Sequence, residues 1–146
     1  MKPTMKAEPW SEAQVEAQRN VASNVASNVA SNELTVHKHE WYTCDRYLIF
    51  NSNGSVMLDV INGVRTPLIW DLWVLEPSRH SGLASKLLDK AEEIAASLGH
   101  AEVRLEWDKR DTPQWVYDWY EHRGYKELYF DRNISTLYKR LKGSKK

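Results

Sequence analysis

The spacing of apolar residues changes along the chain, and each change marks a different kind of element. Residues 11–32 contain three copies of Val-Ala-Ser-Asn, a period of four that would place Val and Ala on one side of a helix. Ser and Asn disfavour helix interiors, so such a helix needs its apolar side docked to be stable. Residues 1–33 are therefore expected to form a separate, low-complexity and mainly helical segment.

After residue 40 the apolar period becomes two, which is typical of β-strands. Three strands are expected at 41–50, 55–61 and 67–75. The turn residues Asn-Ser-Asn-Gly at 51–54 and Asn-Gly at 62–63 separate them. This part of the chain predicts an antiparallel meander.

Helical spacing returns between Gly82 and Leu98, and Gly99 is the expected stop. A strand at 101–107 precedes a helix that begins near Pro113, a favoured residue in a first helical turn, and ends near Gly124. Strands at 125–130 and 134–141 complete the order. The prediction is one α/β (α+β) domain over residues 34–141, a mixed and mostly antiparallel sheet flanked by helices, followed by a basic tail at 142–146.

Charge and cysteine content exclude several classes of protein. The 20 basic and 20 acidic residues of the 146-residue chain cancel, so nucleic acid is not indicated as a partner. No apolar run approaches the roughly 20 residues of a membrane span, and the start lacks a signal peptide. Cys44 has no second cysteine, and His37 and His39 lack a third ligand, so no metal site is expected. A cytoplasmic protein is the simplest interpretation.

Residues 72–84 form a candidate anion-binding site, because a predicted strand there is followed by a short loop and then directly by a predicted helix. The first turn of a helix has unpaired N–H groups and a partial positive charge, which suit a phosphate. Gly82 and Ala84 would let the phosphate approach the backbone, and Arg79 could add a charged contact. The glycine could also serve only the turn. A nucleotide is a weaker alternative, since no Walker-type lysine is present.

Two motifs in order resemble the GNAT family of acyl-CoA N-acyltransferases. The first is the strand Leu72-Trp-Val-Leu-Glu-Pro77 followed by Arg79-His-Ser-Gly-Leu-Ala84. The second is Trp119-Tyr-Glu-His-Arg-Gly-Tyr125 at the end of the last helix. The resemblance implies acetyl-CoA as acyl-donor cosubstrate, bound in a V-shaped gap between the strands near residues 72–74 and 104–106.

The resemblance also implies which residues hold the donor. Leu72, Trp73 and Val74 would pair with pantetheine through their backbone. The pyrophosphate would lie on the loop and helix start formed by Arg79, His80, Ser81, Gly82, Leu83, Ala84 and Ser85.

Direct transfer needs an acid for the leaving thiolate and a base for the attacking amine. Tyr120 matches the family's acid, although a packing role is an equal alternative. Glu106 resembles a strand glutamate used as base by some members, but it lies two residues further from the tyrosine than usual. Asp71 and a water chain remain alternatives for the base.

Three departures from the family pattern concern the cofactor loop and the acceptor side. Ala84 replaces a commoner glycine, Pro113 stands near the place of a frequent asparagine, and no first strand is evident before Leu34. In the family that strand and two helices shape the acceptor side. The acceptor pocket is thus undetermined, and a homodimer partner could complete it.

The function expected from the sequence is acetyl transfer from acetyl-CoA to a primary amine of unknown identity. The alternative is a CoA-binding GNAT-like module with a structural or sensing role and little catalysis.

Overall fold

A computed structural model describes residues 33–62, 66–76 and 81–141. The repeat segment, part of the loop after residue 76 and the basic tail lie outside these residues. Seven strands form one sheet in the order β1-β2-β3-β4-β5-β7-β6. The strands are β1 Thr35–Glu40, β2 Cys44–Asn51, β3 Gly54–Ile61, β4 Leu68–Val74, β5 Glu102–Asp108, β6 Lys126–Asp131 and β7 Ile134–Arg140. The described helices are α2 Leu83–Ser97 and α3 Gln114–His122.

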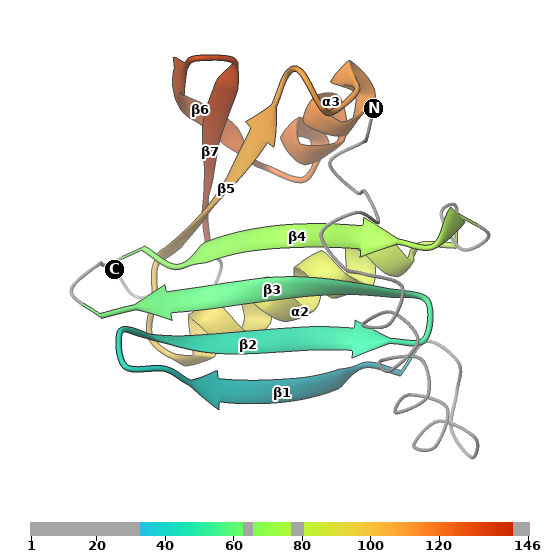
Figure 1. Cartoon of the computed structure of the whole chain (residues 1–146). Coiled ribbons are helices and arrows are strands. Elements are labelled where there is room, and N and C mark those ends of the chain that lie inside the picture. Colours follow the sequence, from blue (N-terminus) through green and yellow to red (C-terminus); the bar gives the residue numbers. More distant parts are fainter. Residues whose placement is uncertain (1–32, 63–65, 77–80, 142–146) are drawn as a thin grey trace.

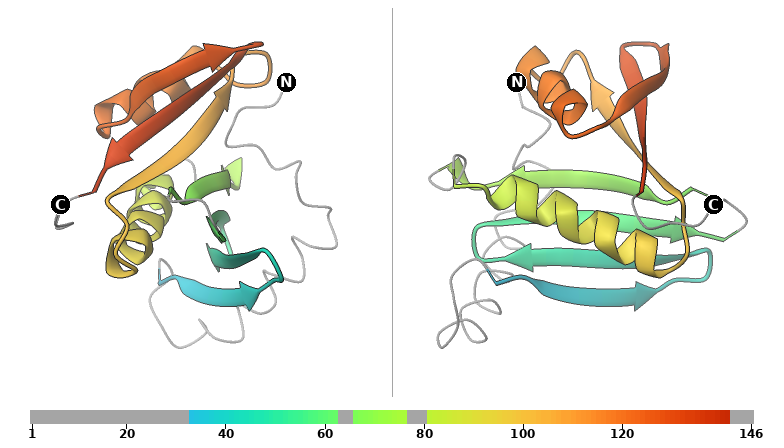
Figure 2. Two further views of the ribbon diagram at one scale, coloured as in Figure 1. Left: turned by 90° about the vertical axis from the view of Figure 1, so that its left-hand side faces the viewer. Right: turned by 180° about the vertical axis from the view of Figure 1, so that it is seen from behind.

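The sheet has two halves, each with one described helix. In Figure 1, α2 lies behind β2–β4, and the view from behind in Figure 2 shows it crossing that face. Helix α3 lies beside β5, β6 and β7 at the other end of the molecule. The predicted mixed sheet with flanking helices is confirmed. All strand pairs are antiparallel except β4 with β5.

The main core forms where α2 meets the sheet. Helix α2 buries one stripe of apolar residues at helical spacing, as its sequence predicts. These side chains pack on the inward residues of β2, β3 and β4. The buried members include Tyr47, Ile49, Val56, Leu58, Ile69, Leu72, Val74, Leu83, Leu87, Leu88, Ala91 and Ala95. The start of α2 and the middle of β4 are therefore held in a fixed relation to each other.

The β2–β3 hairpin closes through a two-residue turn that brings Gly54 against β4. The backbone N–H of Asn53 donates to the Oδ1 atom of Asn51 at 2.8 Å, a side-chain-supported turn. A Cβ at Gly54 would lie 2.8 Å from the carbonyl oxygen of Trp73 and 3.2 Å from the Cα of Val74. Only glycine allows this approach, which presses the hairpin against β4.

The structure contains a strand that the sequence pattern did not reveal. Three strands were expected before the long helix, but β1 precedes them and pairs with β2 along its whole length, from Thr35 to Glu40. It is an edge strand with exposed side chains, so its Thr-Val-His-Lys-His-Glu sequence lacks the apolar alternation of a half-buried strand. His37 and His39 are exposed on this strand. The sheet edge expected to be missing is thus supplied by β1.

Only residues 41–43 connect β1 to β2, so no helix stands between these strands. In the family pattern two helices accompany the first strand on the acceptor side. Within residues 33–62 the chain has none. The connection between β1 and β2 therefore departs from that pattern.

The sheet splits between β4 and β5. These parallel strands pair only where Leu68 lies beside Arg104, and the N–H of Arg104 donates to the carbonyl of Pro67 at 3.0 Å. Beyond this point β5 turns away toward β7, as Figure 1 shows. A gap therefore opens between the carboxyl ends of two neighbouring strands.

Candidate functional site

A cavity of about 250 Å³ occupies the gap between β4 and β5. Both strands, the loop before α3, the end of α3 and the start of β7 contribute to it. Its lining comprises Leu68, Ile69, Trp70, Asp71, Leu72, Leu105, Glu106, Asp108, Asp111, Thr112, Tyr120 and Ile134. The cavity brings together Tyr120, Glu106 and Asp71, the three residues that sequence analysis considered as acid or base.

A β-bulge shapes the β4 wall of the cavity. Ser55 pairs with Trp73 and Met57 with Trp70, so β4 has two residues where β3 has one. Asp71 is one of the two, with φ 56°, a left-handed conformation that aspartate tolerates better than most residues. The bulge breaks the regular ladder with β3 and redirects the backbone of β4 at the point where the strand faces the cavity.

Residues 72–74 can offer mainly their backbone to a ligand. Leu72 and Trp73 are each 3% exposed and Val74 is 1% exposed, so their side chains are packed inside the protein. Pairing of β4 with β5 has ended by this point. A strand that has separated from its neighbour can accept an extended ligand along that edge through amide and carbonyl groups.

Helix α2 begins close to the end of β4, with Gly82 as its N-cap residue. Gly82 has φ 87°, and apart from its two chain neighbours no atom of the described residues lies within 4 Å of the position its Cβ would take. Glycine has no side chain with which to cap the helix, and the first turn contains no acidic residue. The backbone N–H groups of this turn are therefore suited to an anion. Ser81, Leu83, Ala84 and Ser85 lie here, whereas Arg79 and His80 fall outside the described residues.

Tyr120 stands in the last turn of α3 and lines the cavity. The residue is 2% exposed and packs against the rings of Trp119 and Tyr125, at centroid distances of 5.4 and 5.8 Å. Burial raises the pKa of Tyr120 well above its ordinary value. The phenol thus keeps its proton at neutral pH.

The carboxylates of the cavity come from β4, β5 and the loop that follows β5. Glu106 is exposed, and it alternates on β5 with the buried residues Leu105 and Trp107. Asp108 and Asp111 also line the cavity. No motif in the sequence pointed to these two aspartates. The alternation of Glu106 and Asp108 on one side of a strand was the available signal.

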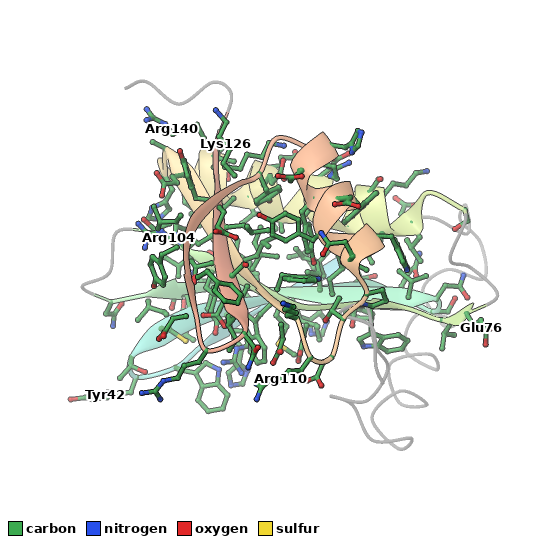
Figure 3. The ribbon with its side chains drawn as sticks, turned by 90° about the horizontal axis from the view of Figure 1, so that it is seen from above. Tyr42, Glu76, Arg104, Arg110, Lys126 and Arg140 are labelled. Atoms are coloured by element: carbon green, nitrogen blue, oxygen red, sulfur yellow. The ribbon has the colours of Figure 1, made fainter. Side chains whose placement is uncertain are left out.

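Arg110 partly neutralises this acidic lining. Its Nε and backbone N–H donate to Oδ1 of Asp108 at 3.2 and 2.9 Å, and its Nη2 donates to Oδ2 at 3.1 Å. Hydrogen bonding to Asp108, supported at longer range by Asp111, raises the pKa of the Arg110 guanidinium. Figure 3 shows Arg110 at the edge of the molecule, in the loop beyond β5.

Trp70 forms the opposite wall and is held by a salt bridge. The guanidinium of Arg46 lies 4.8 Å from the Trp70 ring centroid. The same guanidinium donates to both carboxylate oxygens of Asp59, at 2.8 and 3.0 Å. A bidentate pair under an indole keeps the ring in place. The Trp70 ring is therefore held in place as an apolar part of this wall.

The described residues contain neither a metal-binding cluster nor a membrane-spanning helix. No three His, Cys, Asp or Glu side chains among them gather closely enough to hold a metal ion. No helix within them is long and apolar enough to cross a membrane.

The sequence model described as the acetyltransferase (GNAT) family matches residues 28–134, well over half of the chain. The chain belongs to the GNAT family of acetyltransferases. Both family motifs noted in the sequence lie at the cavity or at the helix start beside it. A search of curated proteins gives no match for this GNAT chain.

Solved structures of other family members share the fold at low sequence identity. An IAA acetyltransferase from Bacillus cereus is 14% identical with a TM-score of 0.60, covering 75% of this chain and 100% of its own. An acetyltransferase from Streptococcus agalactiae is 14% identical with a TM-score of 0.56, covering 93% and 94%. A GNAT acetyltransferase from Elizabethkingia anophelis with acetyl-CoA bound is 13% identical with a TM-score of 0.56, covering 74% and 98%. These likenesses confirm the GNAT fold.

Proposed function

We propose that the chain is an acyl-CoA N-acyltransferase that moves an acetyl group from acetyl-CoA to a primary amine. The observation that carries the proposal is the gap between β4 and β5, with the protonated phenol of Tyr120 buried beside it. Membership of the GNAT family supports this activity. The relative from Elizabethkingia anophelis that holds acetyl-CoA supports the choice of donor.

The donor would lie along β4 and end at the start of α2. Pantetheine is an extended chain with two amides, and the backbone of Leu72, Trp73 and Val74 offers an edge of matching spacing. Its pyrophosphate would be held by the amides of residues 81–85, where the open turn at Gly82 admits an anion. Arg79 and His80 precede this turn in the sequence and would add to this site.

The reaction would proceed by direct attack in the cavity. The neutral amine nitrogen attacks the thioester carbonyl, so a C–N bond forms and the C–S bond breaks. Tyr120 gives its proton to the departing sulfur, and the nitrogen loses a proton to Glu106, either directly or through water. The products are an N-substituted acetamide and the free thiol of CoA. Asp71 lies in the same cavity and is the alternative base.

The proposal is tested by following release of the CoA thiol from acetyl-CoA in the presence of a panel of primary amines. The expected result is release that depends on the amine, with the acetylated amine identified by mass spectrometry. N-acetylated forms of the same amines serve as matched controls and should release none. Tight binding of acetyl-CoA without transfer to any amine would instead favour the CoA-binding module without catalysis.

A further inference from the structure

The two edge strands of the sheet, β1 and β6, differ in what they expose. Among the described residues no strand pairs with the outer side of either one. The middle of β1 carries Lys38, which forms a salt bridge with Glu40 at 3.2 Å, and a charge at this position opposes pairing with another chain. The middle of β6 is apolar instead, since Leu128, Tyr129 and Phe130 are 41%, 56% and 51% exposed. Three consecutive exposed apolar residues on an edge strand favour association.

The two ends of β6 carry opposite charges. The strand reads Lys-Glu-Leu-Tyr-Phe-Asp, and all six residues are exposed. Figure 3 shows Lys126 at the margin of the molecule. The carboxylate of Glu127 is engaged within the chain, because it accepts hydrogen bonds from Tyr117 at 3.1 Å and from Ser135 at 2.9 Å. The terminal charges of the strand are therefore positive at Lys126 and negative at Asp131.

A β-bulge places these two terminal charges on the same face of the sheet. On β7, Lys126 lies opposite Tyr138 and Asp131 lies opposite Ile134. Tyr138 and Ile134 are an even number of residues apart, so they share a face, and residues directly opposite each other in an antiparallel pair also share a face. In a regular strand, Lys126 and Asp131 would point to opposite faces. The extra residue at Leu128 shifts the alternation and brings them to one face.

We infer that β6 pairs in the antiparallel direction with β6 of a second copy of this chain, in the register that places Lys126 of each copy opposite Asp131 of the other. Two-fold symmetry repeats every contact, so the dimer contains two such Lys–Asp pairs. The same register places Leu128 opposite Tyr129 and Glu127 opposite Phe130. Like charges are nowhere directly opposed, and the apolar middles of the two strands cover each other. The two seven-stranded sheets then form one continuous sheet.

The expected dimer is in equilibrium with the monomer. Each copy contributes one strand of six residues, which is less than the standard interface of about 800 Å² per partner. A dissociation constant in the micromolar range is therefore expected. Cross-strand pairs of charged residues contribute measurably to such an interface, so reversing one charge should change this constant.

The first test measures the dissociation constant of the dimer by analytical ultracentrifugation in charge-reversal variants. Lys126→Asp and Asp131→Lys each bring like charges together twice per dimer and should raise the dissociation constant at least about tenfold. The double variant exchanges the two charges and should return to within about threefold of the wild-type value. Lys38→Asp on the edge strand β1 is the matched control, because it changes the net charge by the same amount as Lys126→Asp, and it should leave the dissociation constant unchanged.

The second test uses the wild type alone and follows hydrogen exchange by mass spectrometry at concentrations below and above the dissociation constant. Backbone amides of β6 should exchange more slowly at the higher concentration, whereas those of β1 should not change. A protein that stays monomeric up to about 500 µM would overturn the inference, because the dimer would then be weaker than any micromolar affinity. Protection at a segment other than β6, single reversals without effect, or a double variant no tighter than the single variants would also overturn it.

Discussion

Replacing Tyr120 with phenylalanine removes the proposed acid and little else. The ring packs against Trp119 and Tyr125, and these contacts are kept by phenylalanine. Because this packing is retained, the free energy of unfolding should change by no more than about 1 kcal/mol. A general acid contributes about 10²–10⁴ to the rate, which corresponds to about 3–5 kcal/mol of transition-state stabilisation. We expect kcat/KM to fall by that factor.

The assay measures kcat/KM by thiol release, affinity for acetyl-CoA by calorimetry, and stability by urea unfolding. Tyr117→Phe is the matched control, since Tyr117 lies on the same helix and donates its hydroxyl proton to Glu127 at 3.1 Å. The control should retain wild-type turnover. The assignment of Tyr120 as acid is refuted if Tyr120→Phe keeps more than about a third of the wild-type kcat/KM. A loss of activity matched by weaker acetyl-CoA binding or by unfolding would indicate a packing role instead.

Three other predictions concern the framework of the site. Gly54→Ala places a Cβ 2.8 Å from the carbonyl oxygen of Trp73. The variant should lose about 1–3 kcal/mol of unfolding free energy, measured with urea, and should bind acetyl-CoA more weakly. Wild-type stability together with wild-type binding would contradict this prediction. The hydroxyl of Tyr125 donates a hydrogen bond to Glu92 at 2.7 Å. Tyr125→Phe should therefore lower the unfolding free energy by about 1.5–3 kcal/mol. An unchanged midpoint of urea unfolding would contradict this prediction. Burial and the hydrogen bond to Glu127 raise the pKa of Tyr117 to about 12. As the pH rises, Tyr117 therefore loses its proton in the unfolded chain before it does so in the folded protein. The unfolding free energy should fall above about pH 10 by about 1.4 kcal/mol per pH unit, and it should fall less steeply in Tyr117→Phe. The same pH dependence in the wild type and in Tyr117→Phe would contradict the raised pKa.

Most of the fold could be predicted because its elements carry strong periodic signals. The stripe from Leu83 to Ala95 in α2 and the alternation in β2 and β3 each report burial on one side. Helix α3 begins at Gln114, one residue after the proline expected at its start. The apolar residues that produce the periodic pattern are the same residues that pack together in the core and stabilise these elements.

The edge strand β1 could not be predicted because nothing buries its side chains. Its pairing depends on backbone hydrogen bonds to β2, from Thr35 to Glu40, and such bonds leave no pattern in the sequence. His37 and His39 therefore suggested only surface residues. They are indeed exposed, but on a strand that completes the sheet edge.

The candidate site was predicted in part. Tyr120 and Glu106 were singled out by motif, and the structure places both on one cavity together with Asp71. The bulge at Asp71 depends on the pairing of β4 with β3, and the split from β5 depends on tertiary packing. Neither leaves a local signal. Asp108 and Asp111 line the cavity because of the path that the chain takes from β5 toward α3, and no local pattern in the sequence indicates this path.

Acetyl-CoA binding at the start of α2 is the central claim, and calorimetry on Gly82→Trp and Gly99→Trp tests it most directly. Both glycines have positive φ, 87° and 94°, and open space around the missing Cβ, so each variant carries similar strain of about 1–2 kcal/mol. They flank the 15-residue helix and are separated by roughly 22 Å or more. We expect the wild type and Gly99→Trp to bind acetyl-CoA alike, and Gly82→Trp to bind it at least about tenfold more weakly. Absence of binding by the wild type, or equal binding by both variants, would contradict it.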